Sequence, residues 1–120
     1  MRLSHLICLS ISCICAAFVG CGAEDSENRQ TKVFKPDNSI QCENNGVSLA
    51  DMRKELTSAG IDVICAQKGN TGLAYPAVCG GGTGNINVYL IHTNNLPDAE
   101  KLGFKSVSEL PEYKDSQCSE

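Results

Sequence analysis

Four cysteines between residues 42 and 118 constrain the fold of this chain more than any other feature of its sequence. They are Cys42, Cys65, Cys79 and Cys118, which remain when the apolar N-terminal segment and Cys21 are set aside. An even number of cysteines in a small exported chain predicts disulfides, here two, and four cysteines allow three pairings. The chain has no Cys-x-x-Cys, and the intervals between these cysteines do not match a zinc site, so we expect no metal.

Residues 1–20 form an apolar segment that predicts export from the cytoplasm. Arg2 is its only charge, residues 6–19 are almost wholly apolar, and acidic and amide residues begin beyond Cys21. A positive start, an apolar stretch of about 7–15 residues and an exit of small residues are the parts of a secretory signal. The stretch is marginal for a membrane span, which needs about 20 apolar residues, and an uncleaved anchor is the alternative. Three further cysteines are expected to leave with the signal: Cys8, Cys13 and Cys15.

The exit of this segment, Phe18-Val19-Gly20-Cys21, resembles the lipobox of bacterial lipoproteins. That pattern reads aliphatic, small, Gly/Ala/Ser and then Cys, and Phe18 stands where Leu is usual. The resemblance implies a diacylglycerol thioether on Cys21, cleavage on its N-terminal side and acylation of the new amine. It also implies a membrane anchor facing the periplasm or the cell exterior. Gly22 resembles the residue found there in lipoproteins sent to the outer membrane, where a cell has two membranes.

Ordinary signal cleavage after Ala23 is the competing interpretation of the same segment, and it would release a soluble secreted protein. The two outcomes differ in what holds the protein in place. One acyl chain binds a membrane only marginally, whereas several chains hold firmly. Lipidation of Cys21 therefore decides whether the protein stays at the membrane.

The chain divides into four expected segments. They are a signal peptide (1–20), a lipidated Cys with a flexible tether (21–38), a small α+β domain (39–110) and a polar C-terminal tail (111–120). Residues 22–38 are rich in charged and amide side chains, with only Val33 and Phe34 apolar, which argues against packed structure. The tail is expected to fray unless Cys118 ties it down.

Residues 48–59 carry the clearest helical pattern. Ser48 is expected to cap the N-terminus, and Gly60 is placed to end the helix. One apolar face is expected at helical spacing: Leu49, Met52, Leu56 and Ala59. A second, short helix is predicted over residues 97–102, opened by Asn95.

Strand patterns lie around these helices. Strands are expected at residues 61–65, 75–79, 85–91 and 104–107, with a further short strand possible at 39–42. Turns are expected at residues 68–72 and 80–84, because both segments are rich in glycine. The sum is an α+β class: a small domain with an antiparallel sheet covered by one or two helices and stapled by disulfides.

Candidate chemistry in the sequence is sparse. Residues 80–84 could be an anion-binding loop, but a strand follows them instead of a helix and no Lys lies within them, so we expect a turn. Cys79 with His92 could form a nucleophile and its base, although a disulfide at Cys79 is the expected state. Three tyrosines are expected to pack in the domain, with a recognition surface as the alternative: Tyr75, Tyr89 and Tyr113.

The net charge of the chain limits the kinds of partner that we expect. Without Arg2, nine Lys and Arg face fourteen Asp and Glu, a formal net charge of −5 with no basic cluster, so no nucleic-acid partner is expected. No cofactor is predicted. The expected function is that of a membrane-anchored, non-enzymatic binding or structural module with a protein partner in the cell envelope. The alternatives are a small secreted or envelope enzyme that uses Cys79 and His92, and a soluble secreted inhibitor-like domain.

Overall fold

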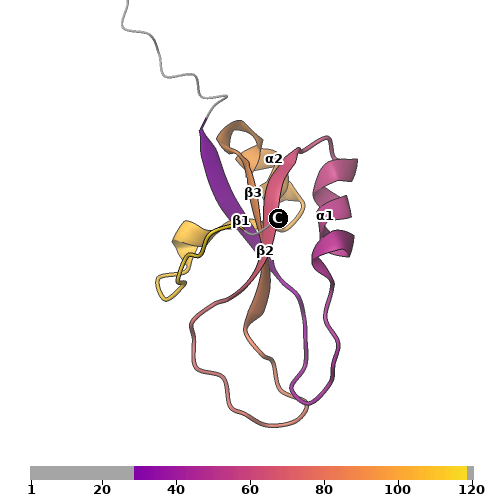
Figure 1. Ribbon diagram of the computed structural model, residues 1–120, viewed down its shortest axis with the longest axis vertical. Coiled ribbons are helices and arrows are strands. Elements are labelled where there is room, and N and C mark those ends of the chain that lie inside the picture. The colour runs from indigo at the N-terminus through magenta and orange to yellow at the C-terminus, as the bar shows by residue number, and fades with distance from the viewer. Residues whose placement is uncertain (1–28, 119–120) are drawn as a thin grey trace, which may run out of the picture.

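Four antiparallel strands make one sheet in the order β2-β3-β1-β4 in the computed structural model, which describes residues 29–118 (Figure 1). The strands are β1 (Gln30–Pro36), β2 (Val63–Asn70), β3 (Asn85–His92) and β4 (Lys105–Ser106). The helices are α1 (Leu49–Ser58) and α2 (Leu96–Lys101), with 3₁₀ turns η2 (Thr93–Asn95) and η3 (Val107–Glu109). The predicted α+β class, with helices on an antiparallel sheet and two disulfides, is confirmed. The predicted signal peptide and the lipobox with Cys21 lie outside the described residues.

Helix α1 begins and ends through local hydrogen bonds that its sequence predicts. The Ser48 hydroxyl accepts the backbone N–H of Asp51 at 3.0 Å, which caps the N-terminus. At the other end Gly60 has a φ of +79°, and the N–H groups of Gly60 and Ile61 donate to the carbonyls of Thr57 and Leu56. This is a Schellman ending, in which a left-handed glycine lets the chain reverse. Ala59, predicted on the apolar face, is exposed because the helix ends before it.

The main core lies between the helices and one face of the sheet. Tyr89, in β3, is fully buried, contacts the Phe104 ring edge-on at 5.9 Å between centroids, and donates its hydroxyl to the carbonyl of Leu49 at 2.7 Å. Edge-to-face aromatic pairs add about 0.5–1.5 kcal/mol beyond the area they bury. The other buried members come from the sheet, α1, α2 and the segment after α1: Val33, Ala66, Ile91, Met52, Leu56, Ala99 and Ile61.

Strand β1 overturns the prediction of a flexible tether over residues 30–36. It lies inside the sheet, paired with β3 on one side and β4 on the other. Val33 and Phe34, the two apolar residues of the segment, are both buried, one on each face of the sheet. The flanking Lys32 and Lys35 form ion pairs with other elements. The low hydrophobicity of the segment concealed the strand, because only two apolar residues, Val33 and Phe34, mark its buried positions.

Strand β2 and the segment after it also differ from expectation. Strand β2 runs to Asn70, through most of the turn predicted at residues 68–72. Residues 75–79, predicted as a strand, belong to the loop between β2 and β3, where no strand is found among the described residues. A hairpin with β3 cannot form there, because β3 already pairs with β1 on one side and β2 on the other. The short strand expected at 39–42 is reduced to a single bridge between Ile40 and Gly82.

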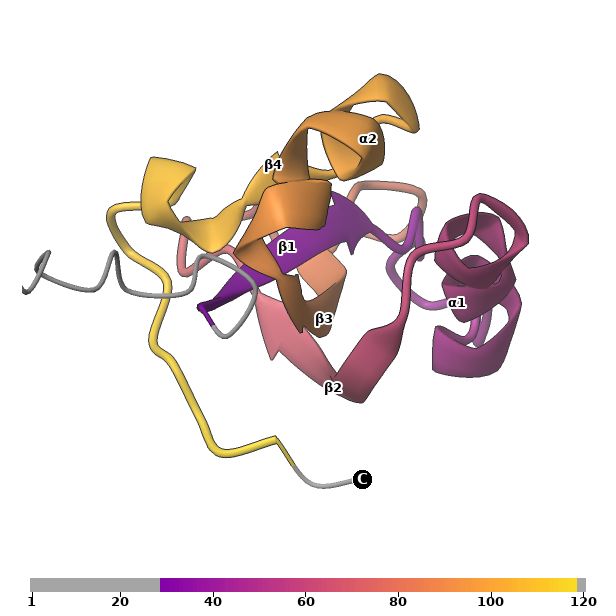
Figure 2. The same ribbon diagram turned by 90° about the horizontal axis from the view of Figure 1, so that it is seen from above.

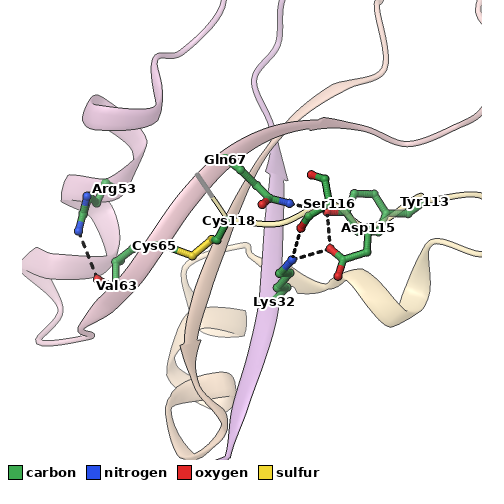
Figure 3. Close-up of a disulfide and its surroundings, with 9 residues drawn as sticks. All are labelled: Lys32, Arg53, Val63, Cys65, Gln67, Tyr113, Asp115, Ser116 and Cys118. Atoms are coloured by element: carbon green, nitrogen blue, oxygen red, sulfur yellow. Dashed lines mark hydrogen bonds and ion pairs between the residues drawn. A yellow bond between two sulfur atoms is a disulfide. The ribbon is translucent and has the colours of Figure 1, made fainter. Parts of the chain in front are cut away.

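The other face of the sheet is covered by residues 107–118, which we call the C-terminal strap (Figure 2). A second apolar cluster is buried under it, with Phe34, Ile86 and Val88 from the sheet and Val107, Leu110 and Tyr113 from the strap. Figure 3 shows three attachments of the strap: the Cys65–Cys118 disulfide, the ion pair of Lys32 with Asp115, and the hydrogen bond between Gln67 and Tyr113. The tail is therefore held in place through Cys118. This is the condition under which the sequence predicted that it would not fray.

Candidate functional site

Two disulfides connect distant parts of the chain, and the predicted number is confirmed. Cys42 pairs with Cys79, with Cα atoms 5.1 Å apart, and Cys65 pairs with Cys118, with Cα atoms 5.9 Å apart. The first bond joins the segment after β1 to the segment before β3. We call these two segments, residues 37–48 and 71–84, the stapled loops. They lie together at the lower end of the view in Figure 1.

Backbone hydrogen bonds hold the stapled loops together beside their disulfide. The N–H of Gln41 donates to the carbonyl of Gly81 at 2.8 Å, and the N–H of Gly80 donates to the carbonyl of Gln41 at 3.1 Å. A disulfide and paired backbone groups both reduce the conformational freedom of a loop. Residues 71–84 would otherwise be a long connection without helix or strand, and such loops are usually functional or disordered.

A second set of contacts links the loops through uncharged side chains. The hydroxyls of Ser39 and Thr83 are 2.6 Å apart, and the Asn85 amide donates to Ser39 Oγ at 3.2 Å. The Asn70 amide donates to Asn85 Oδ1 at 3.1 Å and to the carbonyl of Thr83 at 3.3 Å. These groups satisfy one another, and the network fixes both loops against the ends of β2 and β3.

Next to this network, Asp37 and Lys68 form an ion pair in which their opposite charges offset each other. Asp37 is only 4 % exposed, its Oδ1 accepts the N–H of Ser39 at 2.9 Å, and its Oδ2 accepts from Lys68 Nζ at 3.0 Å. Burial alone would raise the pKa of Asp37, but the hydrogen bonds from Ser39 and Lys68 outweigh it and the pKa lies below its ordinary value. The carboxylate is therefore ionised and already paired, and it buttresses the first loop.

A cavity of about 190 Å³ opens between the stapled loops at the ends of β1 and β3. Its walls come from Pro36, Asn38 and Ser39 on one side and from Thr71, Tyr75 and residues 82–86 on the other. The lining residues, which all belong to the described part of the chain, carry no charge. The cavity thus combines an aromatic ring and aliphatic carbon with hydroxyl and amide groups, as small-molecule sites commonly do.

The position of Tyr75 depends on the glycine before β3. Gly84 has a φ of +73°, and a Cβ built there would lie 2.3 Å from Cε2 of the tyrosine ring. Only glycine lets the ring approach the backbone this closely. Tyr75 remains 40 % exposed, so it lines the cavity and also faces solvent. The glycine-rich composition of residues 80–84 therefore has a packing role that the sequence alone did not indicate.

Large apolar side chains are exposed on the same loop. Leu73 is 53 % exposed and Val78 is 56 % exposed, beside the half-exposed Tyr75. No Asp, Glu, Lys or Arg occurs between Lys68 and Asp98, so the loop presents an uncharged surface. Large apolar side chains exposed within one short loop make that loop a candidate interaction surface.

The candidate pair of Cys79 and His92 is not brought together. Cys79 is bonded to Cys42, and His92 ends β3 at the opposite end from the loop that holds Cys79. The seven residue steps of β3 span about 23 Å. The structure therefore offers neither a free thiol at position 79 nor a nearby base. Among residues 29–118 no cluster of three or more His, Cys, Asp or Glu is arranged to hold a metal ion.

The three tyrosines serve different purposes. Tyr89 is a core residue, as the packing interpretation predicted. Tyr113 belongs to the strap and is half-buried against the sheet, where its hydroxyl accepts from Gln67 and donates to Asp115, and burial is the main cause that raises its pKa. Tyr75 is the one that fits the recognition alternative. The cavity itself was missed from sequence, because its residues come from two distant segments that strand pairing, loop hydrogen bonds and the Cys42–Cys79 disulfide bring together.

Comparison of the chain with protein-family models, with curated proteins and with solved structures finds no match. No helix within residues 29–118 has the length and apolar character needed to cross a membrane. Function is therefore inferred from the geometry of the stapled loops together with the sequence.

Proposed function

We propose that this chain is an exported lipoprotein anchored through Cys21, and that its domain is a non-enzymatic binding module. In this proposal the stapled loops are the binding surface, and another component of the cell envelope is the partner. The observation that carries it is the uncharged, partly apolar surface of residues 71–84, held in place by the Cys42–Cys79 disulfide at one end of the sheet.

Export is supported by the disulfides. Both bonds connect segments far apart in sequence, with separations of 37 and 53 residues. Disulfides of this kind persist in oxidising compartments and are rare in the cytosol. The apolar segment before Gly20 supplies the matching export signal.

The direction of β1 supports a loop surface that faces away from the membrane. Gln30 pairs with His92 at one end of the sheet, and Pro36 pairs with Ile86 at the other, where the stapled loops begin. Strand β1 has seven residues and spans about 20 Å. The nine residue steps from Cys21 to Gln30 can reach at most about 30 Å, whatever their conformation. An anchor on Cys21 would therefore keep Gln30 within about 30 Å of the bilayer, with the stapled loops at the other end of β1.

A binding role is favoured over the enzymatic alternative, because the Cys42–Cys79 disulfide removes the thiol that the enzyme would need. The soluble inhibitor-like alternative differs only in where the signal is cut. The intact mass of the protein from membranes, without reduction and after alkylation, separates these cases. A mass that starts at Cys21, with acyl groups and no alkyl label, is expected. A mass that starts at Glu24 would overturn the anchor, and labelled cysteines would overturn the disulfides.

Photo-crosslinking in cells tests the binding surface. A benzoylphenylalanine replaces Val78 in the exposed loop, and in a matched chain it replaces Asn94, which is exposed in η2 at the opposite end of the sheet. A defined crosslinked product is expected from position 78 and not from position 94. Equal products from both positions, or products from position 94 alone, would contradict the proposed surface.

A further inference from the structure

The geometry points to a neutral sugar ring, one unit of an uncharged glycan, as the ligand of the cavity between the stapled loops. This inference deepens the binding role proposed above and rests on it. The juxtaposition that carries it is the Tyr75 ring beside hydroxyl and amide groups, in a cavity whose residues within the described chain carry no charge.

The uncharged lining of the cavity argues against charged ligands. A phosphate, a carboxylate or a cation that entered the cavity would lose hydration without meeting an opposite charge, which is costly. Two ionised residues near the adjoining strand ends, Asp37 and Lys68, are paired with each other at 3.0 Å. Lys68 also donates to the carbonyl of Val47 at 3.2 Å, so two of the three N–H donors of its amine are used within the protein. The ligand is therefore electrically neutral.

The polar groups of the cavity argue against a purely apolar ligand. A purely apolar ligand would leave the Tyr75 hydroxyl and the Asn38 amide without partners, whereas a sugar ring presents carbon–hydrogen faces and hydroxyls together. The ring of Tyr75 offers an apolar platform, and its hydroxyl, like the exposed side-chain amide of Asn38, has no hydrogen-bond partner among the described residues. A tyrosine hydroxyl and an asparagine amide both donate and accept, which suits the hydroxyls of a sugar.

Size limits the occupant to one ring. The cavity of about 190 Å³ corresponds to roughly six water molecules at their share of liquid volume. Sites for drug-sized ligands are larger, about 300–1,000 Å³. An acyl chain or a helical peptide would not enter, but a single sugar ring is of the right order, with its neighbours in the glycan lying over the exposed loop.

The walls are rigid before any ligand arrives. The Cys42–Cys79 disulfide, the 2.6 Å contact between Ser39 and Thr83 and the close approach of Gly84 to Tyr75 fix both sides of the cavity. Rigidity lowers the entropy lost on binding. A single neutral ring still binds weakly, with a Kd of about 1 mM. Useful affinity in a cell would come from many ring units along one glycan.

The test is a titration of the full chain, in detergent and with its disulfides intact, followed by the amide resonances of Thr83, Gly84 and Asn38. The probes are maltotriose, cellotriose and chitotriose as neutral sugars, with glucuronic acid as the charged comparison. We expect at least one neutral trisaccharide to shift these resonances with a Kd of about 1 mM. No shift at about 20 mM of any neutral probe would overturn the inference, and so would a preference for glucuronic acid.

Two variants test whether the cavity is responsible. Tyr75→Ala is expected to weaken sugar binding by about tenfold, the size of a lost aromatic contact. Ile64→Ala removes an exposed apolar side chain of β2 that lies outside the stapled loops and does not line the cavity, and it is expected to leave binding unchanged. Equal losses in both variants would show that the cavity is not the sugar site. An intact mass with no free thiol confirms that each variant keeps its disulfides.

Failure of this inference is separable from failure of the proposed function. If position 78 crosslinks to an envelope component while no neutral sugar binds, the binding module stands and the glycan is excluded. If a neutral sugar binds the cavity but the protein carries no lipid on Cys21, the ligand stands and the anchor is excluded.

Discussion

The amine of Lys32 lies 2.6 Å from Oδ1 of Asp115 and 2.8 Å from the carbonyl oxygen of Ser116, so strand β1 grips the C-terminal strap through one charged side chain. The contact joins positions 83 residues apart in sequence. The hydrogen bond from Lys32 is the largest cause of an Asp115 pKa below its ordinary value, and burial, the next cause, opposes it. Two different bonds, one ionic and one covalent, therefore hold the same segment.

The covalent bond is expected to dominate. Replacing both Cys65 and Cys118 by Ser should lower the free energy of unfolding by about 4 kcal/mol, because the bond closes a loop of 53 residues. Asp115→Asn should cost less than about 1 kcal/mol, because the Asp115 side chain is 63 % exposed and surface ion pairs contribute little. Urea unfolding of the three proteins measures both values. A cost for Asp115→Asn that equals the loss of the disulfide would contradict this ranking.

The Cys42–Cys79 disulfide is expected to act locally. Replacing both residues by Ser should speed amide hydrogen exchange throughout residues 71–84 while β1 and β3 stay protected, because the sheet is paired independently of the loops. Hydrogen exchange followed by mass spectrometry measures this. The Cys65/Cys118 double variant is the matched control, and it should instead expose residues 107–118. Loss of protection in β3 on removal of Cys42–Cys79 would show that the loops support the whole sheet.

Asp37 is expected to make the free energy of unfolding depend on pH in the acid range. Its folded pKa lies below the ordinary 3.8, so its contribution is fully present above that value and is lost as the pH falls through the folded pKa. Asp37→Asn should cost about 1–3 kcal/mol at neutral pH, because the amide weakens the bonds to Ser39 and Lys68.

The cost of Asp37→Asn should therefore shrink as the pH falls below 3.8. Asp62→Asn is the matched control, since it removes the same charge from an exposed residue. Urea midpoints at several pH values measure both variants. A cost that stays constant down to acid pH would mean that the charge of Asp37 contributes nothing.

Two glycines of one loop offer a matched pair. Gly80→Ala and Gly84→Ala both place a side chain at positive φ, but only at Gly84 would the new Cβ meet another residue, Tyr75, at 2.3 Å. Gly80 has open space around it, so strain alone should cost about 1–2 kcal/mol. Gly84→Ala should cost at least about 1 kcal/mol more, through overpacking. Thermal unfolding compares the two, and equal costs would show that the ring of Tyr75 is not held against Gly84.

Local signals allowed part of this fold to be predicted. Helix α1 was readable because Ser48 and Gly60 mark its ends and its apolar residues repeat at helical spacing. Strand β3 was readable because its apolar residues alternate over its length. Strand β1 was not, because its charged side chains are neutralised by partners 20 and 83 residues away, which no local pattern contains.

The candidate site was harder to predict than the fold. Residues 75–79 resemble a strand in composition, but β3, the next strand along the chain, is already paired on both edges with β1 and β2. The cavity depends on which cysteines pair, and four cysteines permit three arrangements. The sequence therefore indicated that two bonds would form and left open which loops they would bring together.

The order of the bonded cysteines has a consequence for cleavage. Cys65 lies between Cys42 and Cys79, and Cys79 lies between Cys65 and Cys118, so the two closed rings share the stretch from 65 to 79. Any single break in the backbone between residues 42 and 118 leaves the two pieces covalently joined. A protease that cuts beside the exposed Val78 leaves them joined by both bridges, so it would nick the chain without releasing a fragment.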